Sequence, residues 1–273
     1  MSTPQLNDRS FGRITGLMHE AVGLSFTRSK KALVSARLTN RVQQLGLTGF
    51  EDYADLLEGA DDGGEFQMAV DLLTTNETYF FREPAHFALL QAELQRTRPQ
   101  KLAVWSAASS FGDEAYSTAM LLADLQAQGT LGADWSILGT DISERVLQSA
   151  VQGIYPAERL REVSPQRLKR YCLRGEAESE GFVQVRESLR ERVRFGQLNL
   201  CAPIDNLGPF DVIFLRNVLI YFDPPTKSAV VDRVLSQLRP GGLLFLGTAE
   251  GRVPCSTPLT VLAPSAYRKG NER

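Results

Sequence analysis

The spacing of apolar residues predicts helices in the first part of the chain. Between residues 1 and 76, apolar side chains recur every three or four positions, which is the period of a helix with one buried face. The segments with this pattern are residues 11–22, 29–45, 50–57 and 65–73. Glycines separate the later segments and no alternating strand pattern occurs, so we expect a small all-α domain here.

From residue 101 onward, short apolar runs alternate with helical segments. The runs, which we interpret as strands, are residues 102–105, 135–139, 211–215 and 242–246, and the helical segments are residues 114–127, 143–151 and 225–238. Strands that alternate with helices predict an α/β fold, in which helices cover both faces of a parallel sheet. Ligands of such sheets bind at the carboxyl ends of the strands.

The alternation is interrupted between residues 155 and 199. We expect a helix at residues 165–173, followed by an antiparallel ribbon of residues 181–186 and 192–195. The predicted organisation is a helical domain over residues 1–76, a linker over 77–100, and an α/β domain over 101–273 with an inserted subdomain at about residues 156–198.

The composition is that of a globular protein. Of the 273 residues, 43% are hydrophobic and 23% are charged, and the net charge of −2 gives no sign of a nucleic-acid partner. The three cysteines lie far apart, as do His19 and His86, so we expect neither a disulfide nor a metal site. Reduced thiols and a polar start without a signal-peptide pattern lead us to expect a cytoplasmic protein that does not insert into membranes.

The turn after the first strand carries Gly112, Asp113 and Glu114. It lacks the three glycines of a dinucleotide site, and two carboxylates would repel a phosphate group. They would suit a ligand with an ammonium group and no phosphate, such as S-adenosylmethionine. The alternative is that both carboxylates only interact favourably with the helix dipole.

Polar residues follow the next two predicted strands. Asp141 ends the second strand, where a carboxylate can accept hydrogen bonds from ribose hydroxyls; alternatively, Asp141 or Ser143 caps the following helix. Arg216 and Asn217 follow the third strand, and Tyr221 comes shortly after them. The alternative for Tyr221 is core packing with its hydroxyl bonded to the backbone.

The segment TTNETYFFRE, residues 74–83, is denser in hydroxyl, amide and aromatic side chains than a plain linker. It predicts either a buried seam between the two domains or a lid over the ligand site.

Together these segments resemble the chemoreceptor glutamate methyltransferases, the CheR-type family. The resemblance covers residues 11–268 and is most specific at residues 74–83, 104–117, 140–142, 153–155, 199–200 and 210–222. It implies a Rossmann-like S-adenosylmethionine-dependent methyltransferase domain with an inserted antiparallel β-subdomain, preceded by a small all-α domain. The sequence departs from the family at Asp113-Glu114-Ala115, where Glu-Glu-Pro is common, and at Thr248-Ala249-Glu250, where His-Ser-Glu is frequent.

The resemblance also implies roles for individual residues. It implies that the cofactor is bound by Asn76, Thr78, Arg82, Glu114, Asp141, Asn199, Leu200, Arg216 and Asn217. Arg82 and Tyr221 are implied near the transferred methyl group, as catalytic residues.

The activity implied by the resemblance is methylation of glutamate side chains in the cytoplasmic signalling domain of chemoreceptors. The products would be glutamyl methyl esters, which serve sensory adaptation, and S-adenosylhomocysteine. We expect a monomer that uses no metal and binds no nucleic acid. Two alternatives are a catalytically weak, S-adenosylmethionine-binding scaffold for receptors and an RNA methyltransferase, although Asp223-Pro224-Pro225 comes late for the motif of the latter.

The second predicted helix suggests where a receptor docks. Lys30, Arg37 and Arg41 fall within about 40 degrees of one another on a helix, and no acidic residue occurs from position 28 to 42. This stripe predicts an acidic partner surface; alternatively, it pairs with acids of its own domain, such as Asp61 and Asp62. The inserted subdomain has a strongly acidic turn at residues 175–181, so we expect it to bind a receptor's acidic tethering peptide weakly or not at all.

Overall fold

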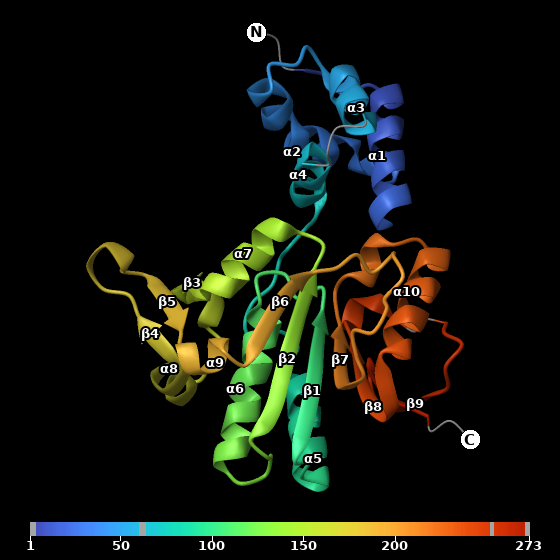
Figure 1. The fold of residues 1–273 in the computed structure, drawn as a ribbon. Helices are drawn as coiled ribbons and strands as arrows, with labels where there is room; N and C mark the ends of the chain where they lie inside the picture. Colours follow the sequence, from blue (N-terminus) through green and yellow to red (C-terminus); the bar gives the residue numbers. More distant parts are fainter. Residues whose placement is uncertain (1–3, 60–63, 252–253, 271–273) are drawn as a thin grey trace.

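The computed structural model describes residues 4–59, 64–251 and 254–270. In this part of the chain it contains a helical unit, a seven-stranded sheet and a small three-stranded sheet (Figure 1). Among the described helices, none combines the length and the apolar character that crossing a membrane requires.

The helical unit has an apolar core of its own. Its elements are α1 (Asp8–Val22), the 3-10 helix η1 (Arg28–Lys30), α2 (Lys31–Gln44), α3 (Phe50–Glu58) and α4 (Gly64–Leu73). α1 begins at Asn7, whose side chain accepts a hydrogen bond from the Ser10 amide, and ends at Gly23, which has a φ of 74°. The side chains at helical spacing, Ile14 and Met18 among them, are fully buried in one cluster. The predicted all-α fold is confirmed.

The large sheet has the strand order β6-β2-β1-β7-β8-β10-β9. Its strands are β1 (Lys101–Ala107), β2 (Asp134–Asp141), β6 (Val193–Gln197), β7 (Phe210–Leu215), β8 (Leu238–Leu246), β9 (Leu259–Ala263) and β10 (Ala266–Lys269). Five neighbouring strands, β6, β2, β1, β7 and β8, are parallel to one another. Strand β10 is antiparallel to both of its neighbours, β8 and β9. From β1 the chain adds β2 and then β6 on one side of the sheet, and it then adds β7 and β8 on the other side of β1. The strand order therefore reverses between β1 and β7.

Helices cover both faces of this sheet, as the alternation of strands and helices predicted. They are α5 (Pro84–Thr97), α6 (Asp113–Ala127), α7 (Glu144–Gln152) and α10 (Pro224–Ser236). In β7, Val212 and Phe214 join the core beneath α5 and α6, while Ile213 and Leu215 join the core beneath α10. α5 was not predicted, although its buried residues Phe87, Leu90 and Leu94 show helical spacing.

The inserted subdomain is the small antiparallel sheet, in the order β3-β5-β4. Its elements are β3 (Ile154–Pro156), the 3-10 helices η2 (Ala157–Leu160) and η3 (Ala177–Ser179), α8 (Pro165–Tyr171), β4 (Cys172–Arg174), β5 (Phe182–Val185) and α9 (Glu187–Arg190). The prediction that residues 192–195 form part of the ribbon is wrong. That segment is β6, which pairs in parallel with β2 at the edge of the large sheet. Alternating apolar and polar residues, with Val193 buried, occur both in an edge strand of a large sheet and in a two-stranded ribbon, so the pattern alone does not distinguish the two.

The helical unit lies against the carboxyl ends of the parallel strands (Figure 1). The Ser25 amide donates to the Tyr221 carbonyl at 2.9 Å, and His19 Nε2 lies 2.7 Å from Asp223 Oδ2. These contacts place helical side chains over the edge of the sheet at which ligands bind.

Asp113 and Arg159 tie the inserted subdomain to the large sheet. Asp113 begins α6 and is fully buried, and Arg159 of η2 donates to its two carboxylate oxygens at 3.0 and 2.8 Å. Burial raises the pKa of Asp113 to about 6, against the opposing effect of the Arg159 charge.

We expect this carboxyl group to make stability depend on pH. Its pKa is above the ordinary value of 3.8, so the folded state keeps the proton to higher pH than the unfolded state. The stabilising contribution is complete below pH 3.8 and is lost as the pH rises through about 6. It amounts to on the order of 3 kcal/mol. Urea unfolding gives the free energy of unfolding of the wild type and of Asp113→Asn. The difference between the two free energies should change between about pH 3.8 and pH 6. A difference that is constant with pH would contradict the prediction.

Candidate functional site

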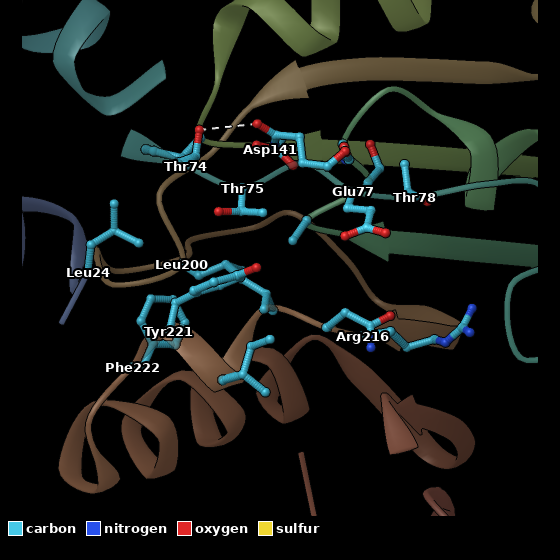
Figure 2. Close-up of a pocket in the computed structure, with 18 of the residues that line it drawn as sticks. Leu24, Thr74, Thr75, Glu77, Thr78, Asp141, Leu200, Arg216, Tyr221 and Phe222 are labelled. Carbon is cyan, nitrogen blue, oxygen red and sulfur yellow. Dashed lines mark hydrogen bonds between the residues drawn. The ribbon is translucent and has the colours of Figure 1, made fainter. Parts of the chain in front are cut away.

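A cavity of about 450 Å³ opens at the carboxyl ends of the parallel strands. Its walls come from the ends of β1, β2 and β7, from the segment after α4, and from residues in and before α2. Figure 2 shows Asp141 and Tyr221 on opposite sides, with Leu24 and Arg216 toward opposite ends. The volume is typical of small-molecule sites, and the position is where the strand order reverses.

The cavity gathers the residues predicted to bind the cofactor or act in catalysis. They are Asn76, Thr78, Arg82, Glu114, Asp141, Asn199, Leu200, Arg216, Asn217 and Tyr221. Lys30 and Arg37 also line it, whereas Arg41 does not. These residues come from segments far apart in the sequence, and the role of each stays a prediction.

Arg216 lies between two carboxylates at the end of β7, with its side chain only 2% exposed. Its Nη1 donates to Glu114 Oε2 at 2.9 Å, and its Nη2 lies 3.2 Å from Glu83 Oε2 and donates to the Arg82 carbonyl. Glu114 also accepts a hydrogen bond from Ser106 Oγ at 2.6 Å. Burial raises the pKa of Glu114, and the charge of Arg216 opposes that rise.

Glu83 was given no role by the sequence analysis, yet it joins three parts of the site. Its Oε1 accepts from the amide and the hydroxyl of Thr248, at 3.3 and 3.2 Å, and from Asn217 Nδ2 at 3.4 Å. Burial acts to raise the pKa of Glu83, but the charge of Arg216 and these hydrogen bonds hold it below its ordinary value. The motif at residues 74–83 marks the segment as unusual, but nothing local indicates partners more than a hundred residues away.

Asp141 ends β2 and is buried at the cavity wall. Its Oδ2 accepts from the Ser110 amide at 2.8 Å and its Oδ1 from the Ser143 amide at 3.0 Å. Each carboxylate oxygen can accept a further hydrogen bond, so both can still bind ligand hydroxyls. The cap of α7 is Ser143, whose side chain accepts from the Val146 amide, and not Asp141.

Of the two carboxylates in the turn after β1, only Glu114 lines the cavity. The suggestion that Asp113 also faces a ligand is wrong, because successive helical residues point about 100 degrees apart and Asp113 pairs with Arg159. Gly112 has a φ of 86°, and a Cβ there would lie 2.9 Å from Phe195 Cζ. The turn therefore requires glycine at this position.

Arg82 and Tyr221 lie in the cavity wall. Arg82 donates from Nη1 to the Glu77 carbonyl at 2.7 Å. Tyr221 ends the 3-10 helix η4 (Leu219–Tyr221) and packs against the core of the helical unit, as the core-packing alternative requires, but none of the described residues hydrogen-bonds its hydroxyl. Its catalytic role stays a prediction. The buried Glu250 was also missed by the sequence analysis; it holds the start of η4 by accepting from the Leu219 amide at 2.7 Å.

Asn199 connects the cavity to the helical unit. Its Nδ2 donates to the Ala21 carbonyl at 2.7 Å, and its Oδ1 accepts from the Cys201 amide at 2.9 Å. Leu200 is buried beside it in the core beneath α10. Asn199 and Leu200, both predicted to bind the cofactor, therefore lie where the two parts of the chain meet.

Several basic residues on and near α2 have partners within the chain. Arg41 Nε donates to Glu65 Oε1 at 3.0 Å, and Lys31 Nζ lies 2.5 Å from Asp8 Oδ1. The stripe is therefore less uniformly positive in space than in sequence, because acids from α1 and α4 approach it.

The suggested partners Asp61 and Asp62 lie outside the described residues. The receptor-docking role of Lys30, Arg37 and Arg41 stays a prediction.

Comparison with known proteins gives matches over nearly the whole chain. The family model described as CheR methyltransferase, SAM binding domain, matches residues 76–260, and the one described as CheR methyltransferase, all-alpha domain, matches residues 9–74. The chemotaxis protein methyltransferase of Escherichia coli K12 is 45% identical over 263 residues, which are 96% of this chain and 91% of that protein. Chemotaxis protein methyltransferase 2 of Pseudomonas aeruginosa is 40% identical over 94% of this chain and 91% of its own.

Among solved structures, a SAM-dependent methyltransferase from Methanosarcina mazei is 15% identical, with a TM-score of 0.31. The match covers 54% of this chain and 52% of that one. This likeness is too low to carry an argument.

The geometry around Arg216 predicts a large loss of stability when its charge is removed. Arg216→Met leaves the partly buried carboxylates of Glu83 and Glu114 without their shared cation, which should cost about 3 kcal/mol of unfolding free energy. Arg82→Met removes a half-buried guanidinium and should cost about 1 kcal/mol or less. Urea unfolding at neutral pH measures both. Equal losses in the two variants would mean that the buried pairs contribute little.

Proposed function

The chain belongs to the CheR methyltransferase family, and we propose that it transfers the methyl group of S-adenosylmethionine to glutamate side chains of chemoreceptors. Family membership makes it a methyltransferase of chemotaxis that uses S-adenosylmethionine. The glutamate substrate is the step that we add. Its main support is that one cavity brings the carboxylates Glu114 and Asp141 together with Arg82 and Tyr221.

The chemistry of the cavity suits S-adenosylmethionine. Its ammonium group requires an acceptor, which the partly buried Glu114 carboxylate can provide, and its ribose hydroxyls can donate to Asp141. Leu200 and Phe222 supply apolar surface for the adenine ring. The lining carries carboxylates at positions where a nucleotide-binding site would hold phosphates, which favours a ligand without them.

The proposed reaction needs no general base. When bound, S-adenosylmethionine supplies a methyl group that its sulfonium charge activates toward an oxygen nucleophile. A free glutamate side chain has a pKa of about 4.3, so the incoming carboxylate is already ionised at neutral pH. Neither His19 nor His86 lines the cavity, so the chain offers no imidazole for this task.

The residues of the chain would act by alignment. Holding two reactants in line can supply on the order of 7 kcal/mol or more of the rate enhancement. The planar guanidinium of Arg82 can orient the incoming carboxylate through a forked contact. The aromatic face of Tyr221 favours positive charge, so this ring would lie beside the group that carries it. Its hydroxyl, which none of the described residues hydrogen-bonds, would donate to a reacting group, and this is the contact that Tyr221→Phe removes. Arg82 must not bind the attacking oxygen too tightly, because ground-state binding slows the step.

The proposal extends to the partner and its location. The cytoplasmic signalling domain of a chemoreceptor would approach the mouth of the cavity, where Lys30 and Arg37 line the wall. Arg41 lies one turn further along α2. The protein would act as a monomer in the cytoplasm, where such receptors present their glutamates.

Transfer of labelled methyl groups tests this function. The protein is incubated with labelled S-adenosylmethionine and the cytoplasmic fragments of receptors from the same cell, and the labelled peptides are mapped. We expect label on glutamate, released by mild base as methanol, as a methyl ester requires. Binding without transfer would indicate a scaffold, and label in RNA would indicate an RNA methyltransferase; either result contradicts the proposal.

Removing the carboxylates at the cavity should weaken cofactor binding. Glu114→Gln and Asp141→Asn each remove a charged acceptor, so the affinity for S-adenosylhomocysteine should fall by about 1.5–3 kcal/mol. Glu93→Gln changes a partly buried carboxylate that does not line the cavity, and serves as the matched control. Calorimetry measures all three. Unchanged affinity in both Glu114→Gln and Asp141→Asn would refute their assignment to the cofactor.

Arg82→Ala and Tyr221→Phe should damage turnover more than binding. We expect kcat to fall by about tenfold or more in each, which corresponds to about 1.4 kcal/mol, with a smaller loss of cofactor affinity. Arg161→Ala and Tyr267→Phe, which change residues outside the cavity, are the controls. Steady-state methylation gives kcat and calorimetry gives the affinity. Wild-type turnover in the Arg82→Ala, Tyr221→Phe double variant would exclude a catalytic role for both.

A further inference from the structure

Arg37 joins α2 to the segment that follows α4. Its Nη1 donates to the Leu73 carbonyl at 2.6 Å and to the Thr74 carbonyl at 3.2 Å. Its Nη2 donates to Thr75 Oγ1 at 2.7 Å. Both ends of the guanidinium fork are therefore engaged by one short stretch of chain, at the point where that stretch enters the cavity wall.

The contacts of Arg37 lie at the C-terminal end of α4. α4 ends at Leu73, and the last carbonyls of a helix have no partner within the helix. A cation at this end satisfies those carbonyls and interacts favourably with the helix dipole. Because the fork is planar, it also restricts the direction in which the chain leaves the helix.

The segment that Arg37 holds leads directly to two cavity residues. Asn76 and Thr78 follow Thr75 within three positions, and both line the cavity. Farther along, the Asn76 carbonyl accepts from Ser110 Oγ at 3.2 Å. The Thr78 carbonyl accepts from Arg159 Nη2, also at 3.2 Å. Arg37 fixes the upstream end of a segment whose downstream end is fixed by the large sheet and the inserted subdomain.

We infer that Arg37 is a positioning residue for the cofactor pocket, acting through residues 73–75 on Asn76 and Thr78. The inference rests on the proposed function, since it takes the cavity to be the pocket for S-adenosylmethionine. It has a consequence for the docking prediction. A change at Arg37 lowers receptor methylation by loosening the pocket, even when the receptor never contacts this side chain.

Arg41 provides the matched control. It is the same residue type, one turn further along the same helix, and it also links α2 to α4, through Glu65. It makes no contact with residues 73–75 among the described hydrogen bonds, and it does not line the cavity. Changing it weakens the α2–α4 contact without removing the clamp on the segment.

The test compares Arg37→Gln, Arg37→Lys and Arg41→Gln in the full-length protein without receptor. Calorimetry with S-adenosylhomocysteine should show a loss of about tenfold or more in Arg37→Gln, which corresponds to about 1.4 kcal/mol. Arg37→Lys keeps the charge but not the fork, so the loss should be intermediate. Arg41→Gln should bind as the wild type does. Amide hydrogen exchange in the ligand-free protein should accelerate at residues 74–79 in both Arg37 variants and not in Arg41→Gln.

The two readouts separate the possible failures. Unchanged exchange and unchanged affinity in Arg37→Lys and Arg37→Gln would overturn the inference, and so would equal effects in Arg41→Gln. If the wild type itself failed to bind S-adenosylhomocysteine, the proposed function would fail. The exchange of residues 74–79 would still decide whether Arg37 holds the segment.

Discussion

The buried guanidinium of Arg216 holds three segments of the chain together at the carboxyl end of β7. Its contacts reach Glu114 at the start of α6, Glu83 at the start of α5, and the backbone of Arg82 between the two domains. A buried cation between two partly buried carboxylates is stable only when each partner is held in place, because an unpaired buried charge is costly. The position of Glu114 at the cavity wall therefore depends on the contacts that Arg216 makes with Glu114, Glu83 and the Arg82 carbonyl. Glu83 also accepts a hydrogen bond from the hydroxyl of Thr248, which links the segment after β8 to the same group of contacts.

The second constraint is that the helical unit forms one wall of the cavity. Leu24 and Leu33 line it from that side, and Asn199 binds the end of α1 through the Ala21 carbonyl. A Rossmann-like sheet alone would leave its carboxyl edge open to solvent. Covering it excludes water, which strengthens every charge interaction in the cavity. The same wall carries Arg37, so a partner that approaches α2 lies within a few residues of the cavity.

The sequence predicted the elements whose signals are local, and missed contacts that depend on distant partners. The apolar runs of β1, β2, β7 and β8 and the helical spacing of α1 and α6 lie within single segments, so periodicity was sufficient. β6 was assigned to the wrong sheet because alternation does not say which neighbour a strand pairs with. Asp113 and Glu114 are adjacent and equally charged, and their environments differ because Asp113 pairs with Arg159 whereas Glu114 pairs with Arg216. The gathering of the predicted site residues in one cavity followed from a family resemblance and not from periodicity.

Backbone strain gathers at the same place as the buried charges. Positive φ angles at non-glycine residues occur at Glu83 (58°) and Asn217 (60°), both next to Arg216, and at Ala108 (63°) and Ser110 (52°) in the turn after β1. Each such residue costs on the order of 1–3 kcal/mol and persists only where the surroundings over-determine it. Two hydrogen bonds to Glu83 provide that support: Asn217 Nδ2 donates to its carboxylate, and so does the amide of Thr248, which follows β8. The strained turn brings the Ser110 amide to Asp141 at 2.8 Å, so the strain contributes directly to the orientation of a carboxylate at the cavity. The strained backbone and its hydrogen bonds therefore hold these side chains in fixed directions, which a reaction that relies on alignment requires.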